Sequence, residues 1–263
     1  MTYPKIPLAQ SIIQICQAKG VTDIVISPGS RNAPLTIGFA SNPDFKCYSI
    51  ADERVAAFFG LGLAQQKHKP VALVCTSGSA LLNYYPAIAE AFYSQIPLIV
   101  ISADRPAEKI DIGDGQTIRQ QNVYDNHILF SANLLAEASP ENDTLINQAI
   151  AVAKYSKGPV HINAPFEEPL YEMVAEPSVQ VEVQFVTPPV YEVTEDLPDY
   201  AQLWNKAKKK LVLVGVNAPN TIDAEIINYL AADPSVVVMT ETTSNLHHDT
   251  FLNSIDTIIT PFT

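Results

Sequence analysis

The chain has 263 residues, of which 16 are Lys or Arg and 28 are Asp or Glu, so its formal net charge is −12 at neutral pH. This excess of negative charge argues against the basic surface of a nucleic-acid-binding protein and against attraction to acidic membranes. Hydrophobic residues make up 47% and charged residues 17%, which is typical of a globular chain with a substantial core and not of a disordered one.

The cysteines and the N-terminus indicate the compartment. Cys16, Cys47 and Cys75 are widely spaced and each lies beside Ile, Val or Tyr, which predicts buried thiols in a reducing environment. The first residues lack the basic segment and apolar run of a signal peptide, and no apolar stretch reaches the roughly 18 residues that a membrane span needs. We therefore expect a cytoplasmic protein without an integral membrane segment.

Short apolar runs alternate with helical patterns over the first 165 residues. The spacing predicts a helix over 5–19, then a strand at 23–27 that stops at a Pro-Gly turn, after which Ser30 is placed to cap the next helix. Further strands are predicted at 45–50, 71–75, 97–102 and 159–163, and further helices at 52–66, 79–94 and 144–157. Near-continuous apolar strands are typical of a parallel sheet that helices cover on both faces. The predicted class is therefore α/β, with a three-layer parallel-sheet domain.

Composition changes after this domain. Residues 171–200 hold seven acidic residues and four prolines but no Lys or Arg, which is typical of a linker. Within them, 179–186 alternates strictly, which predicts either an edge strand or a segment that lies against a domain surface. Beyond them, a helix near 221–231 and strands at 211–216, 236–240 and 256–260 predict a second, incomplete α/β domain. Because the chain stops three residues after the last predicted strand, we expect Thr263 to be a truncation point in a longer natural protein.

Two strand-to-helix turns place backbone N–H groups at the carboxyl edge of the predicted sheet, where open α/β sheets bind ligands. SPGSRNAPL at 27–35 carries Arg31, whereas CTSGSA at 75–80 consists of small residues, with Asn83 one turn into the next helix. Each feature is also compatible with a structural role: a plain connecting turn with a solvated arginine, tight helix-to-sheet packing, and an exposed helical asparagine.

Glu53 begins the helix that follows the strand at 45–50, where the positive end of a helix stabilises a carboxylate. The apolar residues just after it could leave this carboxyl group partly desolvated, which makes it a catalytic candidate. Acidic residues are common at helix starts, so composition alone favours a structural role.

A polar segment at 103–120 follows the strand at 97–102 and contains Arg105 and Gln116. Long polar loops that follow strands are often functional. Together with Arg31, a second arginine near this edge suits a substrate with carboxylates, because a guanidinium pairs with a carboxylate through two parallel hydrogen bonds. The alternative is a solvated loop.

Other signals carry less weight. His247 and His248 lack metal-ligand neighbours, His161 lies in an apolar strand where a hydrogen-bonded core histidine is expected, and the KAKKK run at 206–210 is typical of a solvated helix end. The sequence contains no Gly-rich dinucleotide fingerprint and no P-loop.

Six segments together resemble the N-terminal part of the thiamine-diphosphate-dependent enzymes. In chain order they are SPGSRNAPL, DERVAAFFGLGLAQ, CTSGSALLNYYPAIAEA, PLIVISADRP, GQTIRQ and GPVHINAPFEEPL. Their order and spacing are most similar to the branch of this family that works in menaquinone biosynthesis. The resemblance covers residues 5–170 by specific motifs, and residues 200–263 only as a general strand and helix pattern.

The resemblance implies a domain order and an activity. It implies a pyrimidine-binding domain at 1–178, an acidic linker at 179–200 and the start of a central domain at 201–263. The implied enzyme is a transferase that decarboxylates 2-oxoglutarate and adds the remaining four-carbon unit to isochorismate. Its cofactors are thiamine diphosphate and Mg²⁺, with the metal and diphosphate ligands outside this chain. Family members build the site between subunits, so the resemblance implies a homodimer or homotetramer when full-length and an inactive chain in isolation.

The resemblance also implies roles for particular residues. Glu53 matches the catalytic glutamate that hydrogen-bonds the aminopyrimidine ring of the cofactor. The residues that match the substrate pocket are Ser30, Arg31, Arg105 and Gln116. The residues that match a loop and helix near the pyrimidine are Thr76, Ser77, Gly78 and Asn83.

One position departs from the family. The family commonly has Asn before the glutamine, whereas this chain has Gly115, so a side-chain contact to substrate is lost or replaced by water. The glycine also creates GDG at 113–115, which mimics a cofactor-metal motif. We interpret it as a coincidence, because it does not follow a buried strand and its downstream partner Asn142 is single.

Two other functions are compatible with the sequence. One is a different thiamine-diphosphate enzyme, a 2-oxoacid decarboxylase or acetolactate-type synthase, which would not need Arg31 and Arg105 for isochorismate. The other is a non-catalytic α/β binding module.

Overall fold

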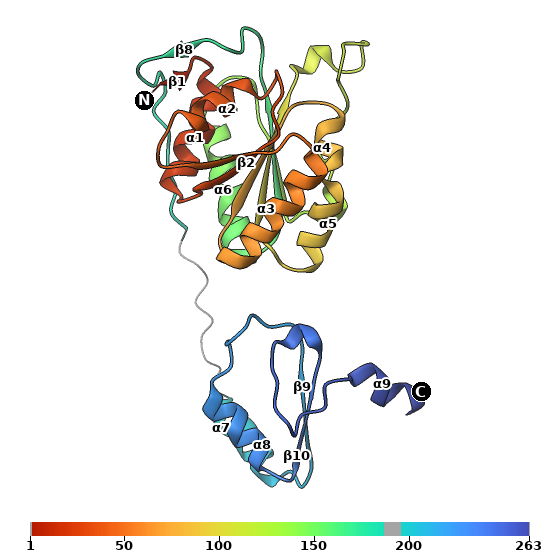
Figure 1. Cartoon of the computed structure of the whole chain (residues 1–263). Helices are drawn as coiled ribbons and strands as arrows, with labels where there is room; N and C mark the ends of the chain where they lie inside the picture. The colour runs from red at the N-terminus through yellow and green to blue at the C-terminus, as the bar shows by residue number, and fades with distance from the viewer. Residues whose placement is uncertain (1, 187–195, 263) are drawn as a thin grey trace. The chain divides into compact units, whose positions relative to one another are not determined.

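The computed structural model describes residues 2–186 and 196–262, which form two compact units on either side of the gap between those ranges. In unit 1, six parallel strands form one sheet in the order β3-β2-β4-β5-β7-β6 (Figure 1). They are β2 (Asp23–Ile26), β3 (Lys46–Ser49), β4 (Val71–Cys75), β5 (Leu98–Asp104), β6 (Phe130–Asn133) and β7 (Val160–Pro165). The sequence did not predict β6. The parallel sheet confirms the predicted fold class.

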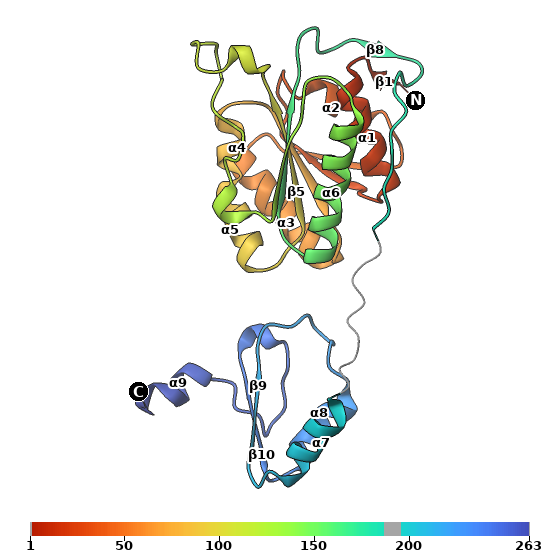
Figure 2. The ribbon, with the colours of Figure 1, turned by 180° about the vertical axis from the view of Figure 1, so that it is seen from behind.

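Helices cover both faces of this sheet (Figures 1 and 2). On one face lie α1 (Pro7–Ala18), α2 (Ala33–Ala40) and α6 (Pro140–Ser156), and on the other α3 (Glu53–Lys67), α4 (Ser79–Asn83) and α5 (Tyr85–Tyr93). Successive strand residues enter opposite cores: Ile24 and Ile26 pack on the α1 side and Val25 on the α3 side. Side chains still alternate between the two faces, but both faces are apolar because helices cover them. The strand sequence is therefore one continuous apolar run.

The helix predicted at 79–94 is two helices that meet at Tyr84. Pro86 lies in the first turn of α5, where a backbone N–H would have no partner within the helix, so its absence costs nothing. The same missing N–H prevents the hydrogen bonds of α4 from continuing into α5. The Tyr84 hydroxyl is buried and lies within hydrogen-bond distance of Ser27 Oγ (3.0 Å) and the Val74 carbonyl (3.1 Å), so this break fastens the helices to β2 and β4.

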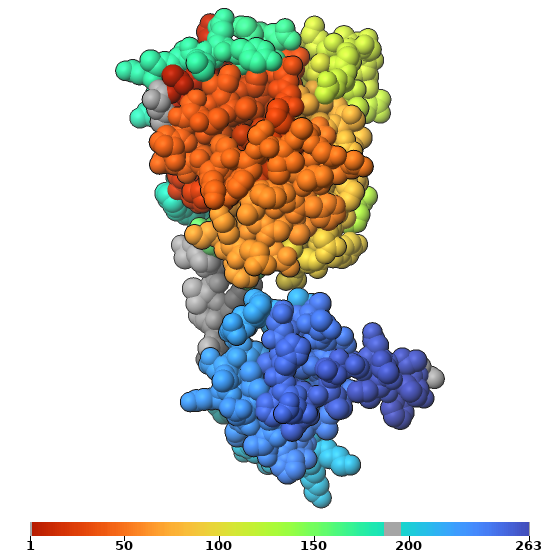
Figure 3. All heavy atoms as spheres, in the orientation of Figure 1, coloured from red at the N-terminus to blue at the C-terminus, as the bar shows by residue number. Residues whose placement is uncertain are grey.

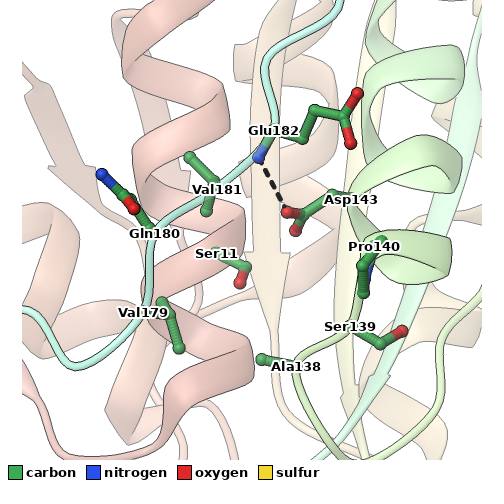
Figure 4. A pocket seen from close by; sticks show the side chains of 9 residues that line it. All are labelled: Ser11, Ala138, Ser139, Pro140, Asp143, Val179, Gln180, Val181 and Glu182. Atoms are coloured by element: carbon green, nitrogen blue, oxygen red, sulfur yellow. Dashed lines mark hydrogen bonds between the residues drawn. The ribbon is translucent and has the colours of Figure 1, made fainter.

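Residues 178–186 lie along α1 and α6 and form no strand, so of the two predicted outcomes the structure shows the segment against the domain surface (Figure 4). Side chains of α6 bond the backbone of this segment, in the way that the backbone of a neighbouring strand would in a sheet. Asp143 Oδ2 accepts from the Glu182 N–H at 2.9 Å, and Asn147 bonds both the Glu182 carbonyl (2.8 Å) and the Gln184 N–H (2.9 Å). The i, i+4 spacing of these two side chains places them on one helix face, within reach of alternate residues of the segment.

A cavity of about 430 Å³ lies beneath this segment, between Ser11 of α1 and the Ser139-Pro140 start of α6 (Figure 4). Ser139 caps α6 by accepting from the Asn142 N–H at 3.2 Å, so this helix begins four residues earlier than predicted. Burial raises the pKa of Asp143, which faces the cavity beside Glu182.

The remaining elements of unit 1 are short. β1 (Tyr3–Pro4) pairs antiparallel with β8 (Met173–Val174), and single 3-10 turns lie at Ala107–Lys109 and Asp125–His127. Cys16 and Cys75 are buried as predicted, whereas Cys47 is half-buried on the edge strand β3.

Unit 2 consists of α7 (Leu197–Lys206), β9 (Lys210–Val214), α8 (Ala224–Ala232), β10 (Val236–Thr240) and α9 (Ile255–Ile259), with 3-10 turns at Thr242–Ser244 and Thr260–Phe262. β9 and β10 pair in parallel, and Val214 and Val238 contribute to a small core. On the other face of this pair, Leu211 and Leu213 are exposed. Residues 187–195 of the predicted linker lie outside the described residues.

The strand predicted at 256–260 is wrong, because α9 occupies those positions. The β-branched run DTIIT resembles a strand, but its backbone pairs with no described strand and forms a helical turn instead. Leu252 already pairs with the edge of β10, through its carbonyl to Thr240 N at 2.8 Å and its N–H to the Val238 carbonyl at 2.9 Å. Among the described residues, no helix is long and apolar enough to cross a membrane.

Candidate functional site

The candidate segments meet at the carboxyl edge of the sheet, at the point where the strand order reverses. β2 lies between β3 and β4, and the chain reaches β3 through α2 on one face and β4 through α3 on the other. Open parallel sheets bind ligands at this reversal point. The segments that follow β2, β3, β4 and β5 are those that carry Arg31, Glu53, Thr76–Gly78 and Arg105.

The turn after β2 packs tightly on the turn after β4. A Cβ atom on Gly29 would lie 2.5 Å from Thr76 Cβ, which is closer than two carbon atoms can approach, so this position requires glycine. The Arg31 N–H donates to Thr76 Oγ1 at 3.3 Å. Thr76 thereby fixes the backbone from which the Arg31 side chain departs.

Arg31 is almost buried, with 11% of its side chain exposed. Its Nη1 donates to the Phe166 carbonyl at 3.0 Å and its Nη2 pairs with Glu168 at 3.4 Å, whereas its buried Nε has no partner among the described residues. Burial lowers the pKa of Arg31, and the positive charge of Arg105 lowers this pKa further. An arginine in this condition gains from a bound anion.

Arg105 is similarly buried, with 14% of its side chain exposed. Its Nε pairs with Asp114 at 2.9 Å, and its Nη1 donates to Ser77 Oγ at 2.5 Å and to the Gln116 carbonyl at 3.4 Å. The backbone N–H of Arg105 donates to Asp104 Oδ1 at 2.7 Å. The guanidinium therefore joins the turn after β4 to the loop after β5.

Arg31 and Arg105 line one cavity of about 340 Å³, together with Lys109, Asp114 and Glu168. The rest of the lining is Pro106 and Glu167. Two nearly buried guanidinium groups that repel each other, each held by one carboxylate, suit the binding of a ligand with carboxylates. The structure thus brings two of the four predicted substrate residues to one cavity.

Gln116 and Ser77 bind each other reciprocally. Gln116 Nε2 donates to the Ser77 carbonyl at 3.0 Å, and Ser77 Oγ donates to the Gln116 carbonyl at 3.2 Å. Gly78 has a φ of +83°, and a Cβ atom there would lie 2.8 Å from the Gln116 carbonyl oxygen. The Gln116 side chain is therefore engaged with the Thr76–Gly78 turn beside the arginines.

Ser30 has a different place from the one predicted. The N-cap of α2 is Asn32, whose Nδ2 donates to the Ser27 carbonyl at 3.0 Å, and Ser30 is exposed. The Ser30 carbonyl accepts from the Ala33 N–H at 3.2 Å. The prediction that Ser30 caps the helix is wrong, because the Pro-Gly turn continues for two more residues.

Glu53 stands at the first position of α3, where Asp52 caps the helix by accepting from the Arg54 and Val55 N–H groups. The Glu53 carboxylate is half-buried and has no hydrogen-bond partner among residues 2–186 and 196–262. Its negative charge raises the pKa of the Cys75 thiol and of the Tyr84 hydroxyl, both of which are chiefly raised by burial. The carboxylate is therefore close to the carboxyl end of β4 and free to accept a hydrogen bond.

Asn83 and the GDG triplet are engaged elsewhere. Asn83 Nδ2 donates to the Ser79 carbonyl of its own helix at 3.2 Å. Asp114 pairs with Arg105, while the Asn142 side chain bonds the backbone of residues 135–137 next to α6. Within the part of the chain that the structure describes, no group of three His, Cys, Asp or Glu side chains is arranged to hold a metal ion.

The sequence did not indicate the carboxylates that hold the two arginines in this cavity, Asp114 and Glu168, nor the Phe166 carbonyl that accepts from Arg31. Glu168 follows β7, whose carboxyl end lies beside that of β5. Acidic residues after a neighbouring parallel strand are a usable signal, because all carboxyl ends of such strands share one edge.

Comparisons with known proteins give the family of this chain. Residues 6–128 match the family described as thiamine pyrophosphate enzyme, N-terminal TPP binding domain. The chain is 65% identical over 267 residues to the 2-succinyl-5-enolpyruvyl-6-hydroxy-3-cyclohexene-1-carboxylate synthase of Flavobacterium johnsoniae, with 100% of this chain and 48% of the relative covered.

Two similar relatives carry the same name. That of Flavobacterium psychrophilum is 67% identical over 264 residues, covering 100% of this chain and 48% of the relative, and that of Christiangramia forsetii is 54% identical over 282 residues, covering 99% and 48%. The chain spans about half the length of the curated relatives it matches, and it corresponds to their N-terminal half. On this similarity, and with residues 6–128 matching their N-terminal TPP-binding domain, the chain belongs to the thiamine pyrophosphate enzymes.

Proposed function

We propose that this chain supplies the pyrimidine-binding half of a thiamine-diphosphate site and the carboxylate-binding pocket beside it. The enzyme would decarboxylate 2-oxoglutarate and add the four-carbon unit to isochorismate, in menaquinone biosynthesis. The observation that carries this proposal is the pair of nearly buried arginines, Arg31 and Arg105, in one cavity at the reversal point of the sheet. The name shared by the relatives supports the same reaction.

Both proposed substrates carry two carboxylates, and the cavity offers three cationic side chains (Arg31, Arg105 and Lys109) beside three carboxylates (Asp114, Glu167 and Glu168). Charge-assisted hydrogen bonds from arginine contribute about 1.5–3 kcal/mol each. A substrate carboxylate would replace the weak Glu168 contact of Arg31, which spans 3.4 Å, and would give the unpaired Arg31 Nε an acceptor. We expect Ser30 and Gln116 to contact the substrate as well, with Gln116 held by Ser77 next to Arg105, whereas Gly115 offers no side chain.

The residues present fit thiamine diphosphate. Glu53 is a half-buried carboxylate without a described hydrogen-bond partner, and it would accept a hydrogen bond from the aminopyrimidine ring. The small residues of the Thr76–Gly78 turn and the nearby Asn83 would lie beside that ring. When bound, the cofactor supplies the electron sink for decarboxylation and carbon–carbon bond formation. The Mg²⁺ and diphosphate ligands are expected outside this chain.

The proposed organisation assigns 1–178 to the pyrimidine-binding domain, 179–200 to the linker and 201–263 to the start of a central domain. We expect a cytoplasmic homodimer or homotetramer at the length of the relatives. Exposed apolar residues on α3 support this state, because Val55, Phe58 and Phe59 are 57%, 49% and 40% exposed. The helix α3, in orange, lies on the face of unit 1 seen in Figure 3. Apolar side chains gathered in this way are typical of an interface.

The test is a fusion of this chain to the C-terminal half of the Flavobacterium johnsoniae relative. We expect this fusion to release CO₂ from 2-oxoglutarate and to consume isochorismate, and we expect Glu53→Gln to lower both rates by at least about 100-fold, since removal of one well-placed catalytic group costs that much. Unchanged turnover in Glu53→Gln would show that the role assigned to Glu53 is wrong. Turnover of pyruvate in place of 2-oxoglutarate would favour an acetolactate-type synthase.

A further inference from the structure

Gln120 is a fully buried residue that touches three separate parts of unit 1. Its Oε1 accepts from the Gly78 N–H at 2.8 Å, at the start of α4. Its Nε2 donates to the Ala103 carbonyl of β5 at 3.1 Å and to Asn163 Oδ1 of β7 at 2.9 Å. Both ends of one carboxamide are therefore used, and they tie the turn after β4 to the two neighbouring strands.

The Gly78 N–H depends on this contact. Gly78 is the residue before the first turn of α4, so its N–H is outside the hydrogen-bond ladder of the helix. Its φ of +83° and the approach of the Gln116 carbonyl leave no room for a side chain that could act as a local cap. A buried N–H without an acceptor is unfavourable, so the turn keeps its conformation only while Gln120 accepts from it.

The strand side of the Gln120 carboxamide is fixed by a directed network. Burial lowers the pKa of His161 to about 3, so its ring is neutral, and its Nε2 lies 2.7 Å from Ser102 Oγ. Ser102 Oγ donates to Asn163 Oδ1 at 2.9 Å, which makes His161 the donor to Ser102. Asn163 Oδ1 thus accepts hydrogen bonds from both the Ser102 hydroxyl and the Gln120 amide. The Asn163 carboxamide cannot rotate by 180° without losing both of these bonds.

The other end of the Asn163 carboxamide leads to Arg105. Asn163 Nδ2 donates to Asp104 Oδ2 at 2.8 Å, and Asp104 Oδ1 accepts from the Arg105 N–H at 2.7 Å. Gln120 is therefore connected to the cavity by two routes. One runs through Gly78 to the Ser77 hydroxyl that receives Arg105 Nη1, and the other runs through Asn163 and Asp104 to the Arg105 backbone.

We propose that Gln120 is a positioning residue for the carboxylate-binding cavity. It holds the Ser77-Gly78 turn against residues 116–120 and thereby sets where the Arg105 guanidinium points. Its kinetic consequence rests on the proposed function, whereas its structural consequence does not. Loss of the carboxamide releases Gly78, and the guanidinium then loses the fixed Ser77 and Gln116 acceptors.

The structural test uses amide hydrogen exchange in the 263-residue chain. Gln120→Met keeps the side-chain length but removes the acceptor and the donor. The matched control is Gln10→Met, because Gln10 is also fully buried and its carboxamide also bonds two backbone groups, the Pro4 carbonyl and the Ser178 N–H, both at 2.7 Å. We expect Gly78 to exchange at least tenfold faster in Gln120→Met and unchanged in Gln10→Met, where Ser178 should accelerate instead.

A second variant and a kinetic measurement complete the test. Gln120→Glu retains an oxygen for the Gly78 N–H, so we expect its exchange at Gly78 to stay slow even if Gln120→Met folds poorly. In the fusion protein, Gln120→Met should raise the KM for isochorismate at least tenfold while kcat changes less than threefold, and Gln10→Met should change neither more than twofold. Equal exchange at Gly78 in wild type and Gln120→Met would overturn the inference, whatever the activity. An inactive wild-type fusion with faster exchange in Gln120→Met would overturn the proposed function and leave the structural role of Gln120 in place.

Discussion

A Cβ atom placed on Gly29 would lie 2.5 Å from Thr76 Cβ, so the turns after β2 and β4 can only pack as they do if residue 29 has no side chain. The Arg31 N–H bond to Thr76 Oγ1 depends on the same contact. The backbone on which the cavity is built is therefore set by one glycine and one threonine.

Gly29→Ala should force these turns apart. We expect the free energy of unfolding to fall by about 1–3 kcal/mol, the usual range for an overpacked site. Gly62→Ala is the matched control, because Gly62 lies inside α3 where an added methyl group would meet no neighbouring described residue within 4 Å. The free energy of unfolding of Gly62→Ala should rise by about 0.5–1 kcal/mol, because alanine is favoured over glycine inside a helix. Urea unfolding of both variants measures this difference, and equal stability of Gly29→Ala and wild type would contradict the close contact.

The segment 178–186 should detach from unit 1 more often when the side-chain hydrogen bonds from α6 to its backbone are removed. Asn147→Ala deletes two hydrogen bonds to the segment backbone, so we expect limited proteolysis within 178–186 to become about tenfold faster, since two such bonds are worth about 1–3 kcal/mol. Gln148→Ala changes the exposed neighbour on the same helix and should leave the cleavage rate unchanged. Equal cleavage rates for the two variants would show that Asn147 does not hold the segment.

His161 should make unit 1 acid-sensitive. Burial lowers the pKa of His161 from 6.5 to about 3, so the unfolded chain binds a proton there that the folded chain does not. The neutral, buried His161 therefore costs no stability above pH 6.5. As the pH falls from 6.5 towards 3, the free energy of unfolding decreases by up to about 1.4 kcal/mol per pH unit. In His161→Gln the slope of the unfolding free energy over this window should be smaller, whereas His68→Asn, at an exposed left-handed position, should keep the wild-type slope. Parallel slopes for wild type and His161→Gln would disprove this linkage.

The chain alone should bind thiamine diphosphate weakly. We expect the Mg²⁺ and diphosphate ligands to lie outside this chain, as proposed above, so that the chain alone would contact only the pyrimidine end of the cofactor. Isothermal calorimetry with thiamine diphosphate and Mg²⁺ should show no tight binding to the 263-residue chain and clear binding to the fusion protein. Tight Mg²⁺-dependent binding by the chain itself would contradict this expectation and point to Asp114 as a metal ligand.

Much of the fold could be predicted because the sheet is parallel and buried on both faces. Runs such as VALVC and LIVIS are apolar throughout, and each is followed by a helix pattern, so their order alone indicates an α/β domain. The DTIIT run shows where this reasoning fails. Its composition is that of a strand, but Leu252 and not this run pairs with the edge of β10, and such pairing is a tertiary fact that no local pattern contains.

The position of the two arginines was predictable to the same depth. Strand ends in a parallel sheet share one edge, so Arg31 and Arg105 could be placed near each other from the sequence. Their partners could not, because the contacts of Arg31 with Phe166 and Glu168 span more than 130 residues of chain. Gln120 was hidden for a similar reason: a glutamine at the end of a polar loop looks solvated until the structure shows it fully buried against β5 and β7.

The most direct test of the Arg31–Arg105 cavity as a carboxylate site is the substrate dependence of Arg31→Ala in the fusion protein. Arg31 supplies charge-assisted hydrogen bonds worth about 1.5–3 kcal/mol, so kcat/KM for isochorismate should fall by about 10- to 150-fold. Release of CO₂ from 2-oxoglutarate should continue. A kcat/KM for isochorismate equal to that of the wild-type fusion would contradict the account, because a cavity that binds substrate carboxylates cannot lose a buried guanidinium without effect.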